Sequence, residues 1–196
     1  MVAVPAGVAV IIGAHPAAAR TAAVIYACGL AGLYGVSSSY HRLVRSPRAR
    51  FWMSRLDHSM IYIFIAASVT PFALVVLRGP WALTLLVAVW AGALGGVALK
   101  MVRMERSAKV GFAMYLILGW CIVAALPQLV HALSATDLVL LIVGGLLYSA
   151  GAVIFAIHRP DPVPAVFGYH EVWHTMVVAA SGCQYFVIRS VLAASH

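Results

Sequence analysis

Charged residues are scarce in this chain, and acidic residues are the scarcest. Only 9% of its 196 residues are charged, and five are Asp or Glu against 13 Lys or Arg. A soluble domain carries about a quarter of its residues as charges, so this chain has too few to cover a water-exposed surface. Hydrophobic residues make up 64% of it, and the mean hydropathy is +1.00. These proportions exclude an ordinary soluble domain and are typical of a membrane protein.

Cysteine and lysine are also rare, and each shortage excludes a class of protein. The three cysteines, Cys28, Cys121 and Cys183, lie far apart inside apolar runs. Their spacing therefore indicates neither a disulfide framework nor a zinc finger. The two lysines, Lys100 and Lys109, both lie between two apolar runs. Because a retinal protein needs a lysine in its last helix, that class is excluded as well.

Long apolar runs fill most of the chain. A spanning helix needs roughly 20 apolar residues, and seven runs approach or reach that length, at about 2–14, 21–41, 57–77, 80–99, 110–130, 137–157 and 170–192. We predict an all-α fold, a single seven-helix transmembrane domain that occupies residues 1–196. The first run is too short to cross at about 1.5 Å per residue. Either it continues through His15 and Pro16, or further residues precede Met1.

Small residues and one proline predict local features of these helices. The glycines between Gly92 and Gly96, and the pair Gly144-Gly145, lie inside predicted helices. Such clusters let neighbouring helices approach closely. Thr70-Pro71 lies inside the third run, where a proline is expected to kink the helix.

The basic residues predict the orientation of the helices, because Lys and Arg concentrate in cytoplasmic loops. One side of the predicted bundle carries only Arg20, Arg78 and Arg189. The other side carries ten basic residues, which are Arg42, Arg45, Arg48, Arg50, Arg55, Lys100, Arg103, Arg106, Lys109 and Arg159. We expect a cytoplasmic N-terminus, an external C-terminus and a multi-pass position in the plasma membrane, which is the inner membrane of a bacterium. The net charge of +8 then reflects topology and contact with anionic lipids, and we expect no nucleic-acid partner.

Three histidines fall at helix ends that this orientation places on one side. The segment HEVWH at 170–174 puts two imidazoles at positions i and i+4 of the last helix, where both can reach one metal. His41 closes the second run, Asp57 opens the third, and Ser37 lies one turn before His41. Three neutral histidines fill three corners of a tetrahedral zinc site and leave the fourth for a water of pKa about 7. Asp57 would accept or orient the proton of that water, and Ser37 would add a hydrogen bond.

The same residues carry a resemblance to a known family. Four segments resemble the hemolysin III family, namely SSSYH at 37–41, RLDHSMIY at 55–62, AASVTPF at 66–72 and HEVWH at 170–174. That family belongs to the progestin and adipoQ receptor group, which includes the adiponectin receptors. The resemblance spans all seven predicted helices and implies the same topology. It also implies a zinc ion held by His41, His170 and His174, with Asp57 and Ser37 beside its water.

The site and the resemblance together predict a zinc-dependent hydrolase of lipid amides or esters. Adiponectin receptors look like ceramidases, and hemolysin III proteins are named for lysis of red cells and linked to membrane lipid homeostasis. Membrane lipids are the expected partners, with an acyl chain between helices and Asp57 passing a proton to the leaving group. The chain lacks the long N-terminal extension of the animal receptors. It is therefore expected to be the minimal bacterial form rather than a hormone receptor.

Three alternatives remain open from the sequence. The segment 170–174 also matches the His-Glu-x-x-His pattern of zinc proteases, in which the glutamate, here Glu171, is the general base. The second alternative is a pore or cytolysin, although no polar face repeats along any predicted helix. The third is a non-catalytic sensor whose zinc is structural. None of these patterns predicts an oligomeric state.

Overall fold

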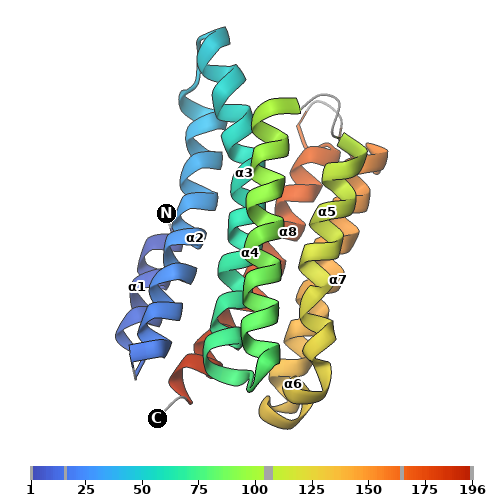
Figure 1. The fold of residues 1–196 in the computed structure, drawn as a ribbon. Coiled ribbons are helices and arrows are strands. Elements are labelled where there is room, and N and C mark those ends of the chain that lie inside the picture. Colours follow the sequence, from blue (N-terminus) through green and yellow to red (C-terminus); the bar gives the residue numbers. More distant parts are fainter. Residues whose placement is uncertain (1, 16, 104–107, 164–165, 195–196) are drawn as a thin grey trace.

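The computed structural model describes residues 2–15, 17–103, 108–163 and 166–194, and within them the chain forms one bundle of helices (Figure 1). Six helical segments are long and apolar enough to cross a membrane, and a seventh is short. The helices are α1 (Ala3–Ile12), α2 (Ala17–Leu43), α3 (Pro47–Pro71), α4 (Pro80–Arg103), α5 (Ala108–Trp120), α6 (Leu126–Ala132), α7 (Ala135–Ile157) and α8 (Tyr169–Ala193). A π-helical turn, Phe72–Val76, extends α3, and a 3-10 segment, Cys121–Ala125, joins α5 to α6. The prediction of an all-α multi-pass membrane protein is confirmed.

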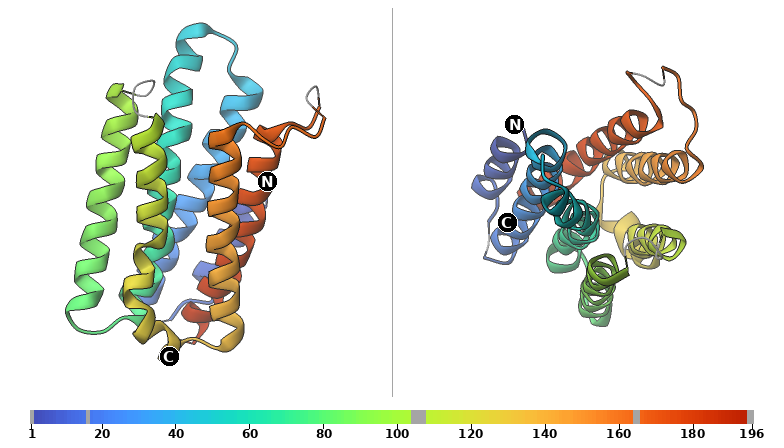
Figure 2. Two further views of the ribbon diagram at one scale, coloured as in Figure 1. Left: turned by 90° about the vertical axis from the view of Figure 1, so that its right-hand side faces the viewer. Right: turned by 90° about the horizontal axis from the view of Figure 1, so that it is seen from above.

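The first predicted span is the short helix α1. It has 10 residues and ends at Ile12, where the amide of Gly13 donates to the carbonyl of Ala9. The helix therefore does not run on through His15, and at about 15 Å it falls well short of a spanning length. It packs against α2 at the outer edge of the bundle, as the view from above shows (Figure 2).

Helix α3 begins ten residues earlier than the apolar run did. The hydroxyl of Ser46 caps its start by accepting from the amide of Ala49 at 3.2 Å, and Pro47 takes the first helical position. The prediction that Asp57 opens this helix was therefore wrong, because Asp57 lies nearly three turns inside it. Apolarity marks where a helix enters the membrane, whereas the cap marks where the helix starts. Arg55 holds this extension by donating from Nε to the carbonyl of Met101, at the end of α4, at 3.3 Å.

The predicted irregularity at Thr70-Pro71 takes the form of the π-helical turn that follows Pro71. The hydroxyl of Thr70 donates to the carbonyl of Ala66 at 2.8 Å and accepts from Nε1 of Trp90 at 3.1 Å. The Thr70 side chain thus ties α3 to α4 beside the proline.

Three glycines bring neighbouring helices into close contact, as the sequence predicted. A Cβ atom on Gly96 would lie 2.5 Å from the ring of Tyr62, which is fully buried in α3. A Cβ atom on Gly92 would lie 2.5 Å from the side chain of Leu118, in α5. Gly144 of α7 similarly faces the Cβ atom of Cys183 in α8, at 3.3 Å. Close contact between helix backbones is typical of membrane bundles, where association depends on packing.

The bundle collects the predicted site elements at one end. The end of α2, the first half of α3 and the start of α8 all lie at the upper end in Figure 1, together with the connections between α2 and α3 and between α7 and α8. Arg20, near the start of α2, and Arg189, near the end of α8, lie at the opposite end. Arg106 falls outside the described residues. The asymmetry of basic residues that predicts a cytoplasmic face therefore coincides with the histidine end.

Candidate metal centre

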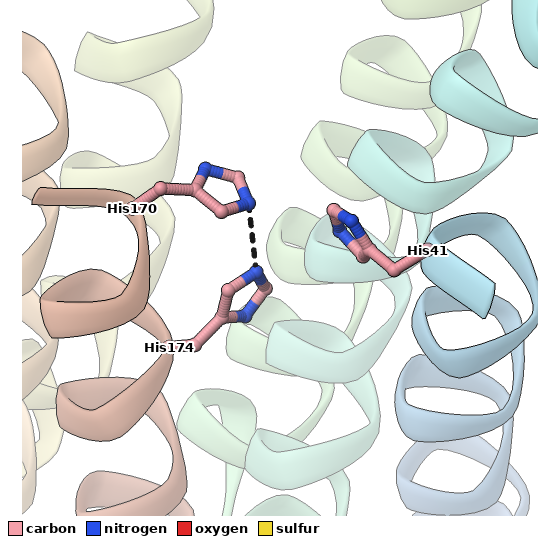
Figure 3. Close-up of side chains that lie close together, drawn as sticks. All are labelled: His41, His170 and His174. Carbon is pink, nitrogen blue, oxygen red and sulfur yellow. Dashed lines mark hydrogen bonds between the residues drawn. The ribbon is translucent and has the colours of Figure 1, made fainter. Parts of the chain in front are cut away.

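Three histidines from two helices meet at that end of the bundle. His41, near the end of α2, faces His170 and His174, which occupy the first two turns of α8 (Figure 3). One ring nitrogen from each residue can be chosen so that all three lie within 4.8 Å of one another. The centroid of the His41 ring lies 5.3 Å from that of His170 and 5.4 Å from that of His174. The structure therefore brings together the three histidines that the sequence predicted as ligands.

The donor set fits a zinc ion. Zn–N bonds of 2.0–2.1 Å in a tetrahedron place ligand nitrogens about 3.3 Å apart. The Nε2 atoms of His170 and His174 lie 3.0 Å apart, and the whole triad stays within 4.8 Å, so small rotations of the rings reach that geometry. Imidazoles suit zinc, and three protein ligands leave a fourth position for water or substrate. The triad could therefore hold a metal ion with an open coordination position.

The start of α8 is held by two carboxylates that do not belong to the triad. Glu171 accepts from the amide of Gly168 at 2.9 Å, which is the reciprocal half of a capping box. Asp161 accepts from the amide of Tyr169 at 3.1 Å. The exposed side chain of Glu171 is thus engaged at the helix end. Glu171 therefore caps the start of α8, whereas His170 and His174 turn toward α2.

Aromatic rings surround the triad and restrict its rotation. Phe155 of α7 packs against the ring of His170, with centroids 5.8 Å apart, and against Trp173 at 5.7 Å. The ring of Tyr40 packs edge-on against His41 at 4.8 Å. Sequence reasoning did not find Phe155, because nothing in the spacing of α7 relates it to α8. Only the packing of the two helices shows that it supports a candidate ligand.

Ser37 and Asp57 lie in the wall of a cavity that also reaches His174. Both side chains are half-buried, and the Asp57 carboxylate lies within electrostatic range of the rings of His170 and His174. Three of the five predicted site residues thus line one cavity, and one of them, His174, also belongs to the triad, although α3 presents Asp57 from its middle. Nothing in the geometry by itself assigns a chemical role to either Ser37 or Asp57.

The cavity extends from the triad far into the bundle. It is lined by side chains of α2, α3, α5, α7 and α8. Its wall follows α3 from Asp57 to Phe72, a rise of about 22 Å at 1.5 Å per residue. Most of the lining side chains are apolar, among them Leu33, Ile61, Phe64, Ile65, Val69 and Val177. A long, mostly apolar cavity with a few polar groups is a typical small-molecule site.

Fold and site together define a class of protein, an all-α multi-pass membrane protein with a three-histidine cluster that could hold a metal ion. The sequence profile of the family described as "Haemolysin-III related" matches residues 1–185. The chain therefore belongs to the haemolysin III-related family, and the resemblance predicted from its motifs is confirmed.

Individual members of this family are similar to the chain over most of its length. Hemolysin-3 of Bacillus cereus is 35% identical over 188 residues, which cover 94% of this chain and 83% of that protein. A hemolysin-3 homolog of Bacillus subtilis is 34% identical over 164 residues, or 84% of this chain and 74% of the homolog. The monocyte to macrophage differentiation factor of Homo sapiens is 31% identical over 176 residues, or 86% of this chain and 69% of the factor. The similarity thus extends from bacterial to animal proteins.

Proposed function

We propose that this protein is a zinc-dependent hydrolase of lipid amides or esters in the plasma membrane. One observation carries the proposal, namely that a triad of imidazoles with metal-binding geometry adjoins a long apolar cavity that also contains a carboxylate. A structural metal is normally closed by four protein ligands, whereas three ligands and a neighbouring substrate cavity suit catalysis. A cavity of this kind would be superfluous around a purely structural ion.

The three histidines would hold the metal in one geometry. His41, His170 and His174 bind through neutral imidazole nitrogens, and Phe155 and Tyr40 keep two of these rings oriented. When bound, zinc polarises a carbonyl oxygen and lowers the pKa of a water molecule to about 7. Because His41 comes from α2 and the other two from α8, the centre also joins two helices that are distant in sequence.

Asp57 is the group we propose for proton transfer. Its carboxylate accepts a proton from the attacking water and passes it to the nitrogen or oxygen of the leaving group. Its position in the cavity wall, near the rings of His170 and His174, suits that transfer. Ser37, in the same wall, would donate a hydrogen bond that holds the water or the substrate oxygen in place.

The apolar part of the cavity suits the hydrocarbon chain of a lipid. One acyl chain fills about half of the roughly 30 Å hydrocarbon thickness of a bilayer, and the cavity wall follows α3 for about 22 Å. A chain lying between the helices would place its amide or ester beside the triad. The apolar walls would also exclude bulk water and strengthen the interactions at the reacting groups.

The experiment that tests this function measures metal and turnover on the same samples. Purified protein in lipid nanodiscs is analysed for zinc and assayed on a panel of ceramides and phospholipids. We expect wild-type protein to contain zinc and to release fatty acid, and the variants His41→Ala, His170→Ala and His174→Ala to lose both. Unchanged zinc in all three variants would refute the site. Firmly bound zinc with no turnover on the whole panel would instead favour a non-catalytic sensor.

We also propose that the histidine end of the bundle faces the cytoplasm. Most of the described basic residues lie at that end, as the positive-inside rule requires of a cytoplasmic face, and Arg20, Arg78 and Arg189 lie at the other. A Ser46→Cys variant, which puts a thiol between α2 and α3, tests this proposal. Intact cells that carry it are treated with a membrane-impermeant thiol reagent. We expect the thiol to be labelled only after the cells are opened. Labelling of intact cells would show that the histidine end faces outward.

A further inference from the structure

The connection between α2 and α3 projects beyond the other described helices at the histidine end. Its turn stands above the ends of α4 and α8 in both side views (Figure 1; Figure 2). Arg55 of α3 donates to the carbonyl of Met101 at the end of α4. From Arg55 back to Pro47 the helix rises about another 12 Å. We call residues 42–56 the basic arm, and the chemistry proposed above makes no use of it.

Positive charge is concentrated on the basic arm. Its 15 residues include five arginines and no Asp or Glu. The guanidinium of Arg55 is engaged, because it lies 3.6 Å from the centre of the Phe51 ring and donates to two backbone carbonyls. The other four arginines are exposed, namely Arg42, Arg45, Arg48 and Arg50. Their side chains form no ion pair and no hydrogen bond with any residue that the structure describes, so these four cations remain available to a partner.

Apolar side chains are exposed among these arginines. Leu43 is 73% exposed, Trp52 50% and Phe51 47%, and the two aromatic rings meet edge-on with centroids 5.2 Å apart. Arginines mixed with aromatic and aliphatic side chains are typical of segments that lie in a membrane interface. A purely polyanionic partner would match the arginines but leave the rings and the leucine uncovered. The surface of an anionic lipid leaflet matches both kinds of side chain.

The level of the basic arm matches the headgroup layer of a bilayer. The apolar run of α3 begins at Asp57, directly below the arm. Headgroups add about 5–8 Å on each side of the hydrocarbon core. Along α3, Trp52 lies about 8 Å above Asp57 and Arg48 about 14 Å above it. The arm therefore crosses this layer, and its long arginine side chains can reach the phosphates from the water-facing side.

We propose that the basic arm is a binding site for anionic phospholipids. Arg45, Arg48 and Arg50 bind their phosphates, and the rings of Phe51 and Trp52 lie in the headgroup layer beside them. Basic clusters directly next to a membrane span attract anionic lipids in this way, and salt screens the attraction. The site goes beyond the proposed function, because it requires neither a metal nor hydrolysis. The lipids it binds surround the bundle rather than occupy the cavity.

The test compares two lipids on purified protein in a neutral detergent, where topology in the cell plays no part. A fluorescent phosphatidylglycerol and a fluorescent phosphatidylcholine with the same chains are titrated at low salt. We expect the wild type to bind phosphatidylglycerol at least about tenfold more tightly, since each arginine near an anionic surface contributes roughly a fivefold factor. In the triple variant Arg45→Gln, Arg48→Gln, Arg50→Gln the ratio of affinities should fall to about two or less. High salt should lower the ratio in the wild type as well.

A matched control separates the arm from the net charge of the protein. The triple variant Arg20→Gln, Arg78→Gln, Arg189→Gln removes the same charge from exposed positions at the opposite end. It should keep the preference of the wild type. Unfolding temperatures show whether both triple variants are folded. Should the arm variant not fold, Arg48→Gln alone should lower the ratio, and the wild-type ratio with its salt dependence still decides the matter.

A polyglutamate peptide distinguishes a lipid surface from an acidic protein, because it carries the charge without acyl chains. Trp52→Ser should weaken the binding of phosphatidylglycerol and leave that of the peptide unchanged. A peptide that binds as tightly as phosphatidylglycerol would overturn the lipid assignment and indicate an acidic protein partner. Equal affinity for the two lipids in the wild type, or the same loss in both triple variants, would overturn the site. A preference that depends on the arm, in a protein that hydrolyses nothing, would support this site and refute only the hydrolase.

Discussion

The Nε2 atoms of His170 and His174 lie 3.0 Å apart on successive turns of α8, and the ring of His41 faces both from α2. Two neutral imidazoles at this distance share one proton, which one ring donates to the other. A metal ion bound by both nitrogens takes the place of that proton. Protons and metal therefore compete for the same lone pairs, and an ion bound by all three rings would add a link between α2 and α8.

Metal removal should destabilise the protein, because a ligand that binds only the folded state adds to its stability. Zinc at about one hundred times its dissociation constant contributes about 2.7 kcal/mol. We expect a chelator to lower the unfolding temperature and zinc to restore it, measured by thermal unfolding in detergent. His41→Ala should lose this response. His131→Ala, which changes an exposed histidine at the opposite end in α6, should keep it, and a response retained in His41→Ala would exclude His41 as a ligand.

Metal retention should depend on pH with a definite sign. Histidine binds metal only when neutral, and an ordinary imidazole has a pKa of about 6.5. As the pH falls below about 6, protons displace the ion, so protein equilibrated at pH 5 should retain much less zinc than protein at pH 7.5. Elemental analysis after buffer exchange measures the difference. Equal retention at the two pH values would be incompatible with a site made of three histidines.

Two carboxylate-to-amide changes separate the lipid hydrolase from a zinc protease. Asp57→Asn should lower turnover by about a hundredfold to ten-thousandfold, the usual contribution of a general acid or base, while zinc content stays normal. Glu171→Gln should have a small effect, since glutamine can also accept from the amide of Gly168 in the cap. Turnover and zinc are measured on both. The reverse order of effects would identify Glu171 as the general base and support the protease.

Filling the cavity should shorten the lipid chain that it accepts. Ala152 is buried in the cavity wall on α7, so Ala152→Phe projects a ring into the space. Each methylene excluded from an apolar site costs about 0.8 kcal/mol, so the loss of three or four contacts should reduce kcat/KM for long chains by about a hundredfold. Short-chain substrates should be affected far less. Ala150→Phe, on the exposed face of the same helix, is the control, and an unaltered chain-length profile in Ala152→Phe would place the lipid elsewhere.

Substitution by alanine should change the stability of the protein in opposite directions at two adjacent glycines in α4. Gly96→Ala forces a methyl group against the buried ring of Tyr62, and overpacking of this kind costs about 1–3 kcal/mol. Gly95→Ala meets no atom within 4 Å and should be neutral or stabilising by up to about 1 kcal/mol. Unfolding midpoints in detergent compare the two. Equal effects would mean that α3 and α4 are not in close contact at this level.

Much of the fold follows from the sequence because the bilayer imposes a simple rule. Apolar runs of about 20 residues become helices, so α4, α7 and α8 begin and end within a few residues of the predicted spans. The rule fails where polar residues continue a helix beyond the apolar run. α3 extends ten residues toward Pro47, because Ser46 supplies a cap and the arginines that follow are compatible with a helix. Hydropathy has no means of detecting such an extension.

The sequence alone determined the number of apolar segments, the pairing of His170 with His174 and the side on which His41 would lie, because helical periodicity and charge asymmetry are local properties of the chain. Only the tertiary structure decided how near His41 comes to the pair, where the cavity runs and which residues line it. Those features depend on how α2, α3, α7 and α8 pack against one another. A lone Tyr34 or Tyr148 in an apolar run has no pattern that distinguishes a cavity wall from a lipid-facing surface. The wall exists only because side chains from separate helices leave a space between them.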